Sequence, residues 1–196
     1  MNNESFLILE HSNLIKHCVV LGAINGIDDI SDLVDGVDCP NGAVSGIVYD
    51  MDSDFPNNLV LTDSLMNVHG LAVVSERLAD VIKKQEVPMV KYYSVGIRNH
   101  KGKILPDPYY ILHPVSPIDC LDVQACGARM SRVDKSMIAS VKRLSLITDL
   151  IASSRKIFRP SNFPEVTLVR RDLAEILDAT GYTGFRWVEL SQYPEI

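Results

Sequence analysis

The chain has 196 residues, 46% of them hydrophobic, and a formal net charge of −6 at pH 7. It is long enough to bury the core of one domain or of two tightly packed ones, and its acidic balance argues against nucleic acid as a partner. The apolar run Cys18–Ile24 is far shorter than the roughly 20 residues that span a bilayer, and no basic, apolar signal segment opens the sequence. We therefore expect a cytoplasmic protein with no membrane span.

The first third of the chain alternates apolar segments with turn-rich, acidic stretches. Three elements are predicted there: a strand at Ser5–Glu10, an apolar element of uncertain type at Leu14–Ala23 and a short strand at Gly46–Tyr49. The intervening residues 25–41 are rich in turn residues and aspartates. We predict an acidic N-terminal region, residues 1–66, packed on an α/β core of residues 67–196.

Charge is unevenly placed along the chain. Residues 1–66 contain eleven acids and the single base Lys16, a net charge of −10, whereas residues 67–196 contain fourteen acids and eighteen bases, a net charge of +4. This asymmetry favours an acidic face that attracts a basic partner; the alternative is that the aspartates only solvate turns. Eight residues are the candidates for a partner-binding face: Asp28, Asp29, Asp32, Asp35, Asp38, Asp50, Asp52 and Asp54.

Two stretches that lie ninety-five positions apart are similar, residues 71–95 and residues 166–190. Each has an apolar run, a short amphipathic stretch, a turn and an apolar-polar-aromatic run, an order that predicts a strand, a helix and a second strand. Ser75 is the expected N-cap of the first helix, and Asp172, followed by Glu175, that of the second. The expected buried stripes are Leu78, Val81 and Ile82, and Leu173, Ile176 and Leu177.

Between the two copies, Val90–Arg98 and Tyr109–His113 flank a polar loop and predict a hairpin. The later segment Met137–Ile151 fits a helix and a strand equally well. The predicted fold class is α+β, with a mixed sheet built on two similar strand-helix-strand units plus a hairpin.

No cofactor or metal motif is recognisable. The four cysteines form no CxxC pair, so we expect reduced thiols and no zinc site. Asp50, Asp52 and Asp54 begin like a calcium loop, but Phe55 and Leu61 stand where glycine and glutamate are required. The five histidines are dispersed. We predict no cofactor, no metal and no catalytic residue.

Six short patterns provide a further indication: Val73–Leu78, Asn99–Lys103, Tyr109–Tyr110, Pro117–Asp122, Ile157–Arg159 and Gly181–Phe185. In this order they resemble a bacterial immunity protein family, the eleventh catalogued in polymorphic-toxin systems and formerly a domain of unknown function. The resemblance covers about Phe55 to Leu190. It implies a strand at Val141–Ile147 and a small cytoplasmic protein that binds a secreted or contact-delivered toxin and blocks its active site. It transfers no catalytic residue.

Three functions remain open on the sequence. The first is an immunity protein whose acidic face suits a basic toxin such as a nuclease. The second is a non-toxin interaction module with an apolar or symmetric interface. The third is a small-molecule enzyme with a cleft where the two similar units meet, using His113, Cys120 or Asp119.

Overall fold

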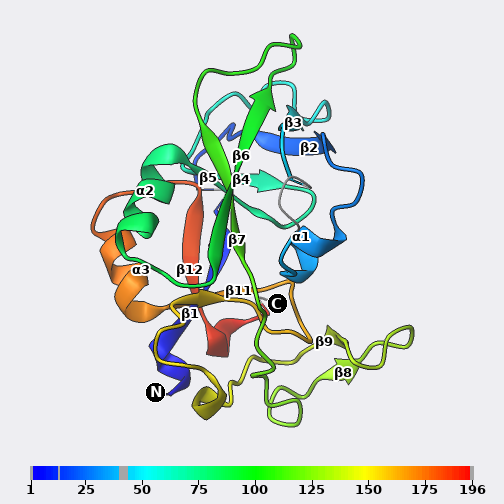
Figure 1. Ribbon diagram of the computed structural model, residues 1–196, viewed down its shortest axis with the longest axis vertical. Coiled ribbons are helices and arrows are strands. Elements are labelled where there is room, and N and C mark those ends of the chain that lie inside the picture. Colours follow the sequence, from blue (N-terminus) through cyan, green and yellow to red (C-terminus); the bar gives the residue numbers. More distant parts are fainter. Residues whose placement is uncertain (1, 13, 40–43, 195–196) are drawn as a thin grey trace.

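The structure, a computed structural model, describes residues 2–12, 14–39 and 44–194. Its strands form a closed six-stranded barrel, a four-stranded sheet and a separate two-stranded hairpin. The barrel occupies the upper half of Figure 1 and the four-stranded sheet the lower half. The predicted α+β class is confirmed.

The barrel strands are joined in the order β2-β3-β6-β7-β5-β4. Their bounds are β2 Val20–Asn25, β3 Ile47–Met51, β4 Ser64–Asn67, β5 Ala72–Ser75, β6 Val90–Arg98 and β7 Tyr109–Pro114. The β2–β4 and β3–β6 pairings are parallel and the others antiparallel. The predicted hairpin is confirmed, since Val90 lies opposite Pro114 and Val95 opposite Tyr109.

The second sheet is antiparallel throughout, in the order β10-β11-β1-β12. Its strands are β1 Phe6–His11, β10 Ile157–Phe158, β11 Thr167–Arg170 and β12 Phe185–Glu189. The predicted first strand of the chain therefore lies inside this sheet, between two strands from the C-terminal end. The hairpin of β8, Arg129–Met130, and β9, Ile138–Ser140, projects at the lower right of Figure 1.

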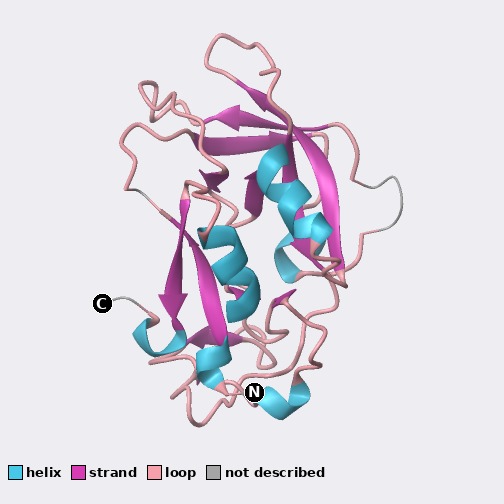
Figure 2. Cartoon of the chain, turned by 90° about the vertical axis from the view of Figure 1, so that its left-hand side faces the viewer, coloured by secondary structure: helices cyan, strands magenta, loops and turns pink. Residues whose placement is uncertain are grey.

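Three α-helices lie in the described part of the chain: α1 Ser31–Asp35, α2 Glu76–Lys84 and α3 Arg171–Asp178. Short 3-10 turns are η1 Asn3–Ser5, η2 Thr148–Leu150 and η3 Leu190–Gln192. Figure 2 shows α2 above α3 on the same side of the molecule, where they link the barrel to the four-stranded sheet.

The two similar stretches form the same elements in the same order, but in different sheets. The first contains β5, α2 and β6 in the barrel, and the second contains β11, α3 and β12 in the four-stranded sheet. In each case a third strand from elsewhere lies between the two and antiparallel to both, β7 in the barrel and β1 in the sheet. The expectation of one mixed sheet is therefore wrong, because each unit pairs with its own inserted strand.

One apolar cluster joins the two units. Leu78, Ala79 and Ile82 of α2 are buried together with Leu173, Ala174 and Leu177 of α3. Val81 is only partly buried, and Ile176, expected in the second stripe, is 38% exposed. In both helices an alanine, Ala79 in α2 and Ala174 in α3, is buried in this cluster instead.

Only one of the two predicted caps is present. The Ser75 side chain accepts a hydrogen bond from the Leu78 amide at 3.4 Å, as expected for an N-cap. Helix α3 begins at Arg171, so Asp172 lies within its first turn and does not cap it. Its carboxylate accepts hydrogen bonds from Arg170 instead.

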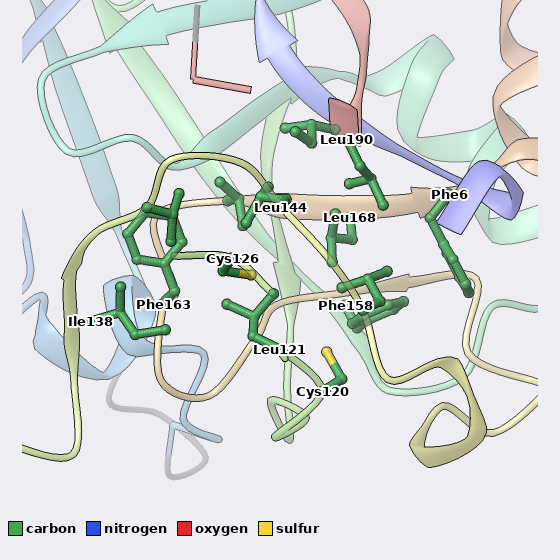
Figure 3. Close-up of a cluster of buried hydrophobic side chains, with 14 of the residues drawn as sticks. Phe6, Cys120, Leu121, Cys126, Ile138, Leu144, Phe158, Phe163, Leu168 and Leu190 are labelled. Atoms are coloured by element: carbon green, nitrogen blue, oxygen red, sulfur yellow. The ribbon is translucent and has the colours of Figure 1, made fainter. Parts of the chain in front are cut away.

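Strands β5 of the barrel and β11 of the four-stranded sheet are buried on both faces. Val73 faces the barrel interior while Ala72 and Val74 face the helices, and Val169 faces the helices while Leu168 faces the lower core. This double burial explains why these segments have continuous apolar runs rather than alternating patterns. Figure 3 shows the lower core, in which Cys120 and Cys126 lie among leucine and phenylalanine side chains.

The strand expected at Val141–Ile147 is wrong. Within it only Leu146 forms a bridge, an isolated one with Leu121. Three backbone hydrogen bonds join this segment to residues 120–126, Lys142 to Cys126, Asp122 to Ser145 and Ile147 to Cys120, whereas the amide of Leu144 bonds to Leu190. Residues 123–127 form a turn and offer no extended partner, so the segment stays irregular while its apolar side chains fill the lower core.

A candidate partner-binding surface

The acidic helix α1 is attached to the protein by a buried arginine. Arg159 is 2% exposed. Its Nη1 donates hydrogen bonds to the carbonyl oxygens of Leu33, at 3.1 Å, and Val34, at 2.6 Å, and its Nε donates to Thr167 Oγ1 at 3.3 Å. Carbonyls in the last turn of a short helix lack partners within the helix, so the guanidinium satisfies them and fixes α1 in place.

The charge of Arg159 persists at neutral pH despite its burial. Burial lowers the pKa of its guanidinium to about 10, and the nearby carboxylate of Asp35 acts in the opposite direction. A cation at the carboxyl end of a helix is favourable because the unpaired carbonyls carry partial negative charge. The acidic helix is thus held by a buried positive charge.

Two residues of the β6–β7 hairpin hold the segment that follows α1. The Nε2 atom of buried His113 lies 2.8 Å from the carbonyl oxygen of Val37, and Lys91 forms an ion pair with Asp38. Burial lowers the pKa of His113, so its imidazole is neutral at pH 7 and carries its proton on Nε2, toward the carbonyl. Residues 31–38 are therefore anchored at several points.

The aspartates around α1 point to solvent. Asp28, Asp29, Asp32 and Asp35 are all exposed. Asp29 also organises the start of the helix, because its Oδ1 accepts hydrogen bonds from the amide and hydroxyl groups of Ser31 at 2.8 and 2.6 Å. These hydrogen bonds lower the pKa of Asp29, so its carboxyl group stays ionised near neutral pH.

The other three candidates lie on and beyond β3. Asp50 forms an ion pair with Arg98 at 3.0 Å and accepts a hydrogen bond from Asn25 at 3.1 Å. Asp52 accepts one from the amide of Asp54 at 2.9 Å. Asp50 and Asp52 are half-buried, whereas Asp54 is exposed.

The eight carboxylates are spread along β2 rather than gathered in one compact patch, and Asp50 lies beside Asn25. The amide of Asp52 bonds to the carbonyl of Val20 at the start of β2, whereas Asp28 follows Asn25 at its end. At about 3.3 Å per residue, these ends lie about 17 Å apart. Two of the eight, Asp38 and Asp50, already have cationic partners.

The junction of the two similar units is filled by apolar side chains. It leaves a cavity of about 10 Å³ among residues that include Val74, Leu78 and Leu177, which is near the smallest volume that holds one water molecule. The candidate residues for an enzyme site are not gathered there. His113 bonds to Val37, Cys120 is buried in the lower core, and Asp119 accepts a hydrogen bond from Asn162.

The thiol of Cys120 is unsuited to nucleophilic attack, because burial and the nearby charge of Asp119 raise its pKa to about 12. All four cysteines are free thiols. In the described ranges, no group of three or more His, Cys, Asp or Glu side chains is placed to hold a metal ion. Across the same residues, no helix has the length and apolar character needed to cross a membrane.

The sequence pattern of the immunity protein family Imm11 matches residues 35–192. The chain belongs to this family. A search of curated proteins gives no match. The resemblance to this immunity family is therefore confirmed, and it extends further toward the N-terminus than the motifs indicated. The Imm11 match begins at Asp35, the last residue of α1, and includes β3 and the aspartates that follow it.

The Imm11 region also contains the anchors of α1, which the sequence analysis did not single out for this role. Arg159 appeared only as the last residue of the pattern Ile157–Arg159, and His113 was considered only as an enzyme residue. One feature of the sequence could have indicated the role of Arg159. It directly follows the apolar pair Ile157–Phe158, at a position where a buried strand would be expected to continue with another apolar residue. A cation in such a run requires a buried partner.

Proposed function

We propose that this Imm11 protein binds a cognate bacterial toxin, secreted or delivered by contact, and neutralises it by blocking the active site. Membership of the immunity family carries the proposal. The anchoring of α1 supports it, because a surface held in place before binding loses less conformational entropy when a partner docks. The protein would act in the cytoplasm, where an incoming toxin reaches its target.

The charge distribution favours a basic partner. The net charge of −10 over residues 1–66 would attract a toxin with a basic cleft, such as a nuclease, and speed the encounter. The eight aspartates named above contribute to this acidic face. The exposed Asp28, Asp32, Asp35 and Asp54 would contribute most, since Asp38 and Asp50 already pair with lysine and arginine.

Co-expression provides the test. The protein encoded by the gene adjacent to this one is produced in a bacterial host alone and together with the Imm11 protein. We expect growth arrest with the first and growth with both, together with a complex that survives size-exclusion chromatography. An unrelated acidic protein of similar size is the control for charge alone. Lack of rescue and lack of a complex would together contradict the proposal.

A further inference from the structure

Exposed apolar side chains are concentrated in two segments that lie beside strands β2 and β4. Of the sixteen large hydrophobic residues that are exposed in the described ranges, seven come from residues 14–15 and 55–68. Three are more than half exposed: Leu14 at 85%, Val68 at 64% and Leu59 at 61%. Single exposed apolar residues are normal on a protein surface, whereas a gathered group marks an interaction site. We call the seven the β2–β4 face: Leu14, Ile15, Phe55, Leu59, Val60, Met66 and Val68.

Backbone hydrogen bonds bring the two segments together. The amide of Val60 donates to the carbonyl of His17, and the amide of Val19 donates to the carbonyl of Val60, both at 2.9 Å. Farther along, Val20 of β2 lies beside Met66 of β4 in a parallel pairing. Of the seven residues, Met66 lies in a barrel strand and Val60 forms an isolated bridge with Cys18, while the other five lie in loops next to these two strands.

The face contains a hollow that suits a protruding apolar side chain. Its volume is about 300 Å³, and Ile15, Phe55 and Met66 line it together with Cys18 and Val20. Six polar residues also line it: Ser12, Lys16, His17, Asn58, Thr62 and Ser64. A hollow of this size with both apolar and polar walls is typical of sites that bury part of a ligand or partner.

The backbone of two acidic residues lies beside this hollow. The amide of Phe55 donates to the carbonyl of Asp52, and the amide of Asp52 donates to the carbonyl of Val20. Because Phe55 and Val20 line the hollow, Asp52 and Asp54 lie at its edge. Neither carboxylate forms an ion pair within the part of the chain that the structure describes. Lys16 and His17 are the basic residues that line the hollow.

We propose that the β2–β4 face is the toxin-docking surface, and that its occupant presents an apolar side chain flanked by lysine or arginine. Charge complementarity selects this occupant. A second copy docked across a two-fold axis would set the same acidic edge against itself, and an anionic membrane surface would repel Asp52 and Asp54. The hollow supplies affinity, and the two carboxylates orient the basic partner.

This inference rests on the proposed function but specifies where contact occurs. In this arrangement Phe55 and Met66, rather than the aspartates around α1, contribute most of the binding energy. Asp52 and Asp54 then lie beside the docked toxin. The aspartates around α1, which follow the far end of β2, act by long-range attraction.

The test measures binding of the adjacent gene's product to a Phe55→Glu, Met66→Glu double variant. The matched control is Val133→Glu, Leu150→Glu, which places the same charge on apolar side chains that are 98% and 56% exposed elsewhere. We expect the dissociation constant to rise on the order of 100-fold in the first variant, and by less than about threefold in the control. Thermal unfolding of both variants should match that of the wild type.

The outcomes separate the two proposals. Tight binding by the wild type and equally tight binding by the double variant would overturn the docking surface and leave the immunity function intact. No binding and no growth rescue by the wild type would overturn both. Sedimentation analysis without toxin is a further test. A dimeric wild type together with a monomeric double variant would assign the face to self-association and overturn the inference.

A measurement on the wild type alone covers the case in which the double variant does not fold. Cys18 lines the hollow and is the one cysteine of the four that is not buried. Its alkylation by iodoacetamide, followed by mass spectrometry, should be slower in the complex than in the free protein. An unchanged rate at Cys18 in a purified, stoichiometric complex would overturn the assignment.

Discussion

The buried carboxylate of Asp63 and the guanidinium of Arg77 face each other in a two-point ion pair, with Nε–Oδ1 at 2.5 Å and Nη2–Oδ2 at 2.6 Å. The same carboxylate accepts hydrogen bonds from Ser75 Oγ and from the amide and hydroxyl groups of Thr183. Ser75 and Arg77 belong to the first strand-helix-strand unit, and Thr183 precedes the last strand of the second. Asp63 therefore joins the two units through polar contacts at the edge of their apolar junction.

Replacing Asp63 should destabilise the protein strongly. Asp63→Ala removes five hydrogen bonds and leaves the Thr183 amide without its acceptor, so we expect the free energy of unfolding to fall by about 3 kcal/mol. Arg77→Ala should cost less, about 1 kcal/mol, because the arginine side chain is 59% exposed and Asp63 keeps its other donors. Urea denaturation followed by circular dichroism measures both values.

A matched control for this pair is Asp80→Ala. Asp80 forms an exposed ion pair with Lys83 on the surface of α2, so its loss should change the free energy of unfolding by less than about 0.5 kcal/mol. Equal destabilisation by Asp63→Ala and Asp80→Ala would contradict the role given to Asp63.

Mild acid should weaken the attachment of α1 through His113. Burial lowers the pKa of this imidazole below its ordinary value of 6.5, and its Nδ1 is buried without a hydrogen-bond partner in the described residues. Below about pH 6.5 the His113 imidazole is therefore protonated in the unfolded chain, while it stays neutral in the folded chain until the pH reaches its lower folded pKa. Stability is complete above that pH and falls as the pH drops toward the folded pKa.

We expect the urea midpoint of the wild type to be lower at pH 5.5 than at pH 7.5, and His113→Gln to show a smaller drop. A glutamine amide can still donate to Val37, so this variant removes the titration while keeping the donor. Burial also lowers the pKa of His11 and of His69, so part of the pH dependence should remain. The same drop in both proteins would exclude His113 as a contributor.

Local elements were predictable from the sequence, but their pairing was not. The Ser75 cap and the β6–β7 hairpin depend on neighbouring residues, so the chain itself reveals them. By contrast, Leu7 pairs with Val169 on one side and Glu189 on the other, and no feature of β1 indicates these distant partners. Apolar runs buried on both faces, as in β5 and β11, suit either sheet equally well, so the existence of two separate sheets could not be read from them.

The candidate site was predictable to a similar degree. Asp28 and Asp32 are exposed, as their place among turn residues suggested. The anchor of α1 was not predictable, because Arg159 bonds to main-chain carbonyls, which every residue has. The sequence did not indicate the β2–β4 face for another reason. Phenylalanine and methionine are residue types that usually lie in a protein core, and only the fold shows that the side chains of Phe55 and Met66 remain exposed.

Replacing Arg159 should release α1 selectively. Arg159→Met keeps the length of the buried side chain but removes every donor, which leaves the carbonyls of Leu33 and Val34 without these partners. We expect a loss of about 2 kcal/mol in stability. Hydrogen exchange should be faster in residues 31–38 than in the wild type, while β11 keeps its protection. Uniform acceleration across the protein would show that Arg159 supports the whole fold rather than this segment.

Reversing the charge of three of the eight candidate aspartates should slow toxin association without abolishing it. Asp28→Lys, Asp32→Lys, Asp54→Lys changes three exposed side chains that form no ion pair with described residues. Electrostatic attraction acts mainly on the association rate, so at low salt we expect this rate to fall by about tenfold or more and to lose its dependence on salt concentration. The control Glu86→Lys, Asp149→Lys, Glu175→Lys alters the net charge equally at exposed sites elsewhere. Stopped-flow measurement of binding to the adjacent gene's product distinguishes an effect of these three positions from an effect of net charge. Equal slowing in both variants would contradict a specific role for the three aspartates.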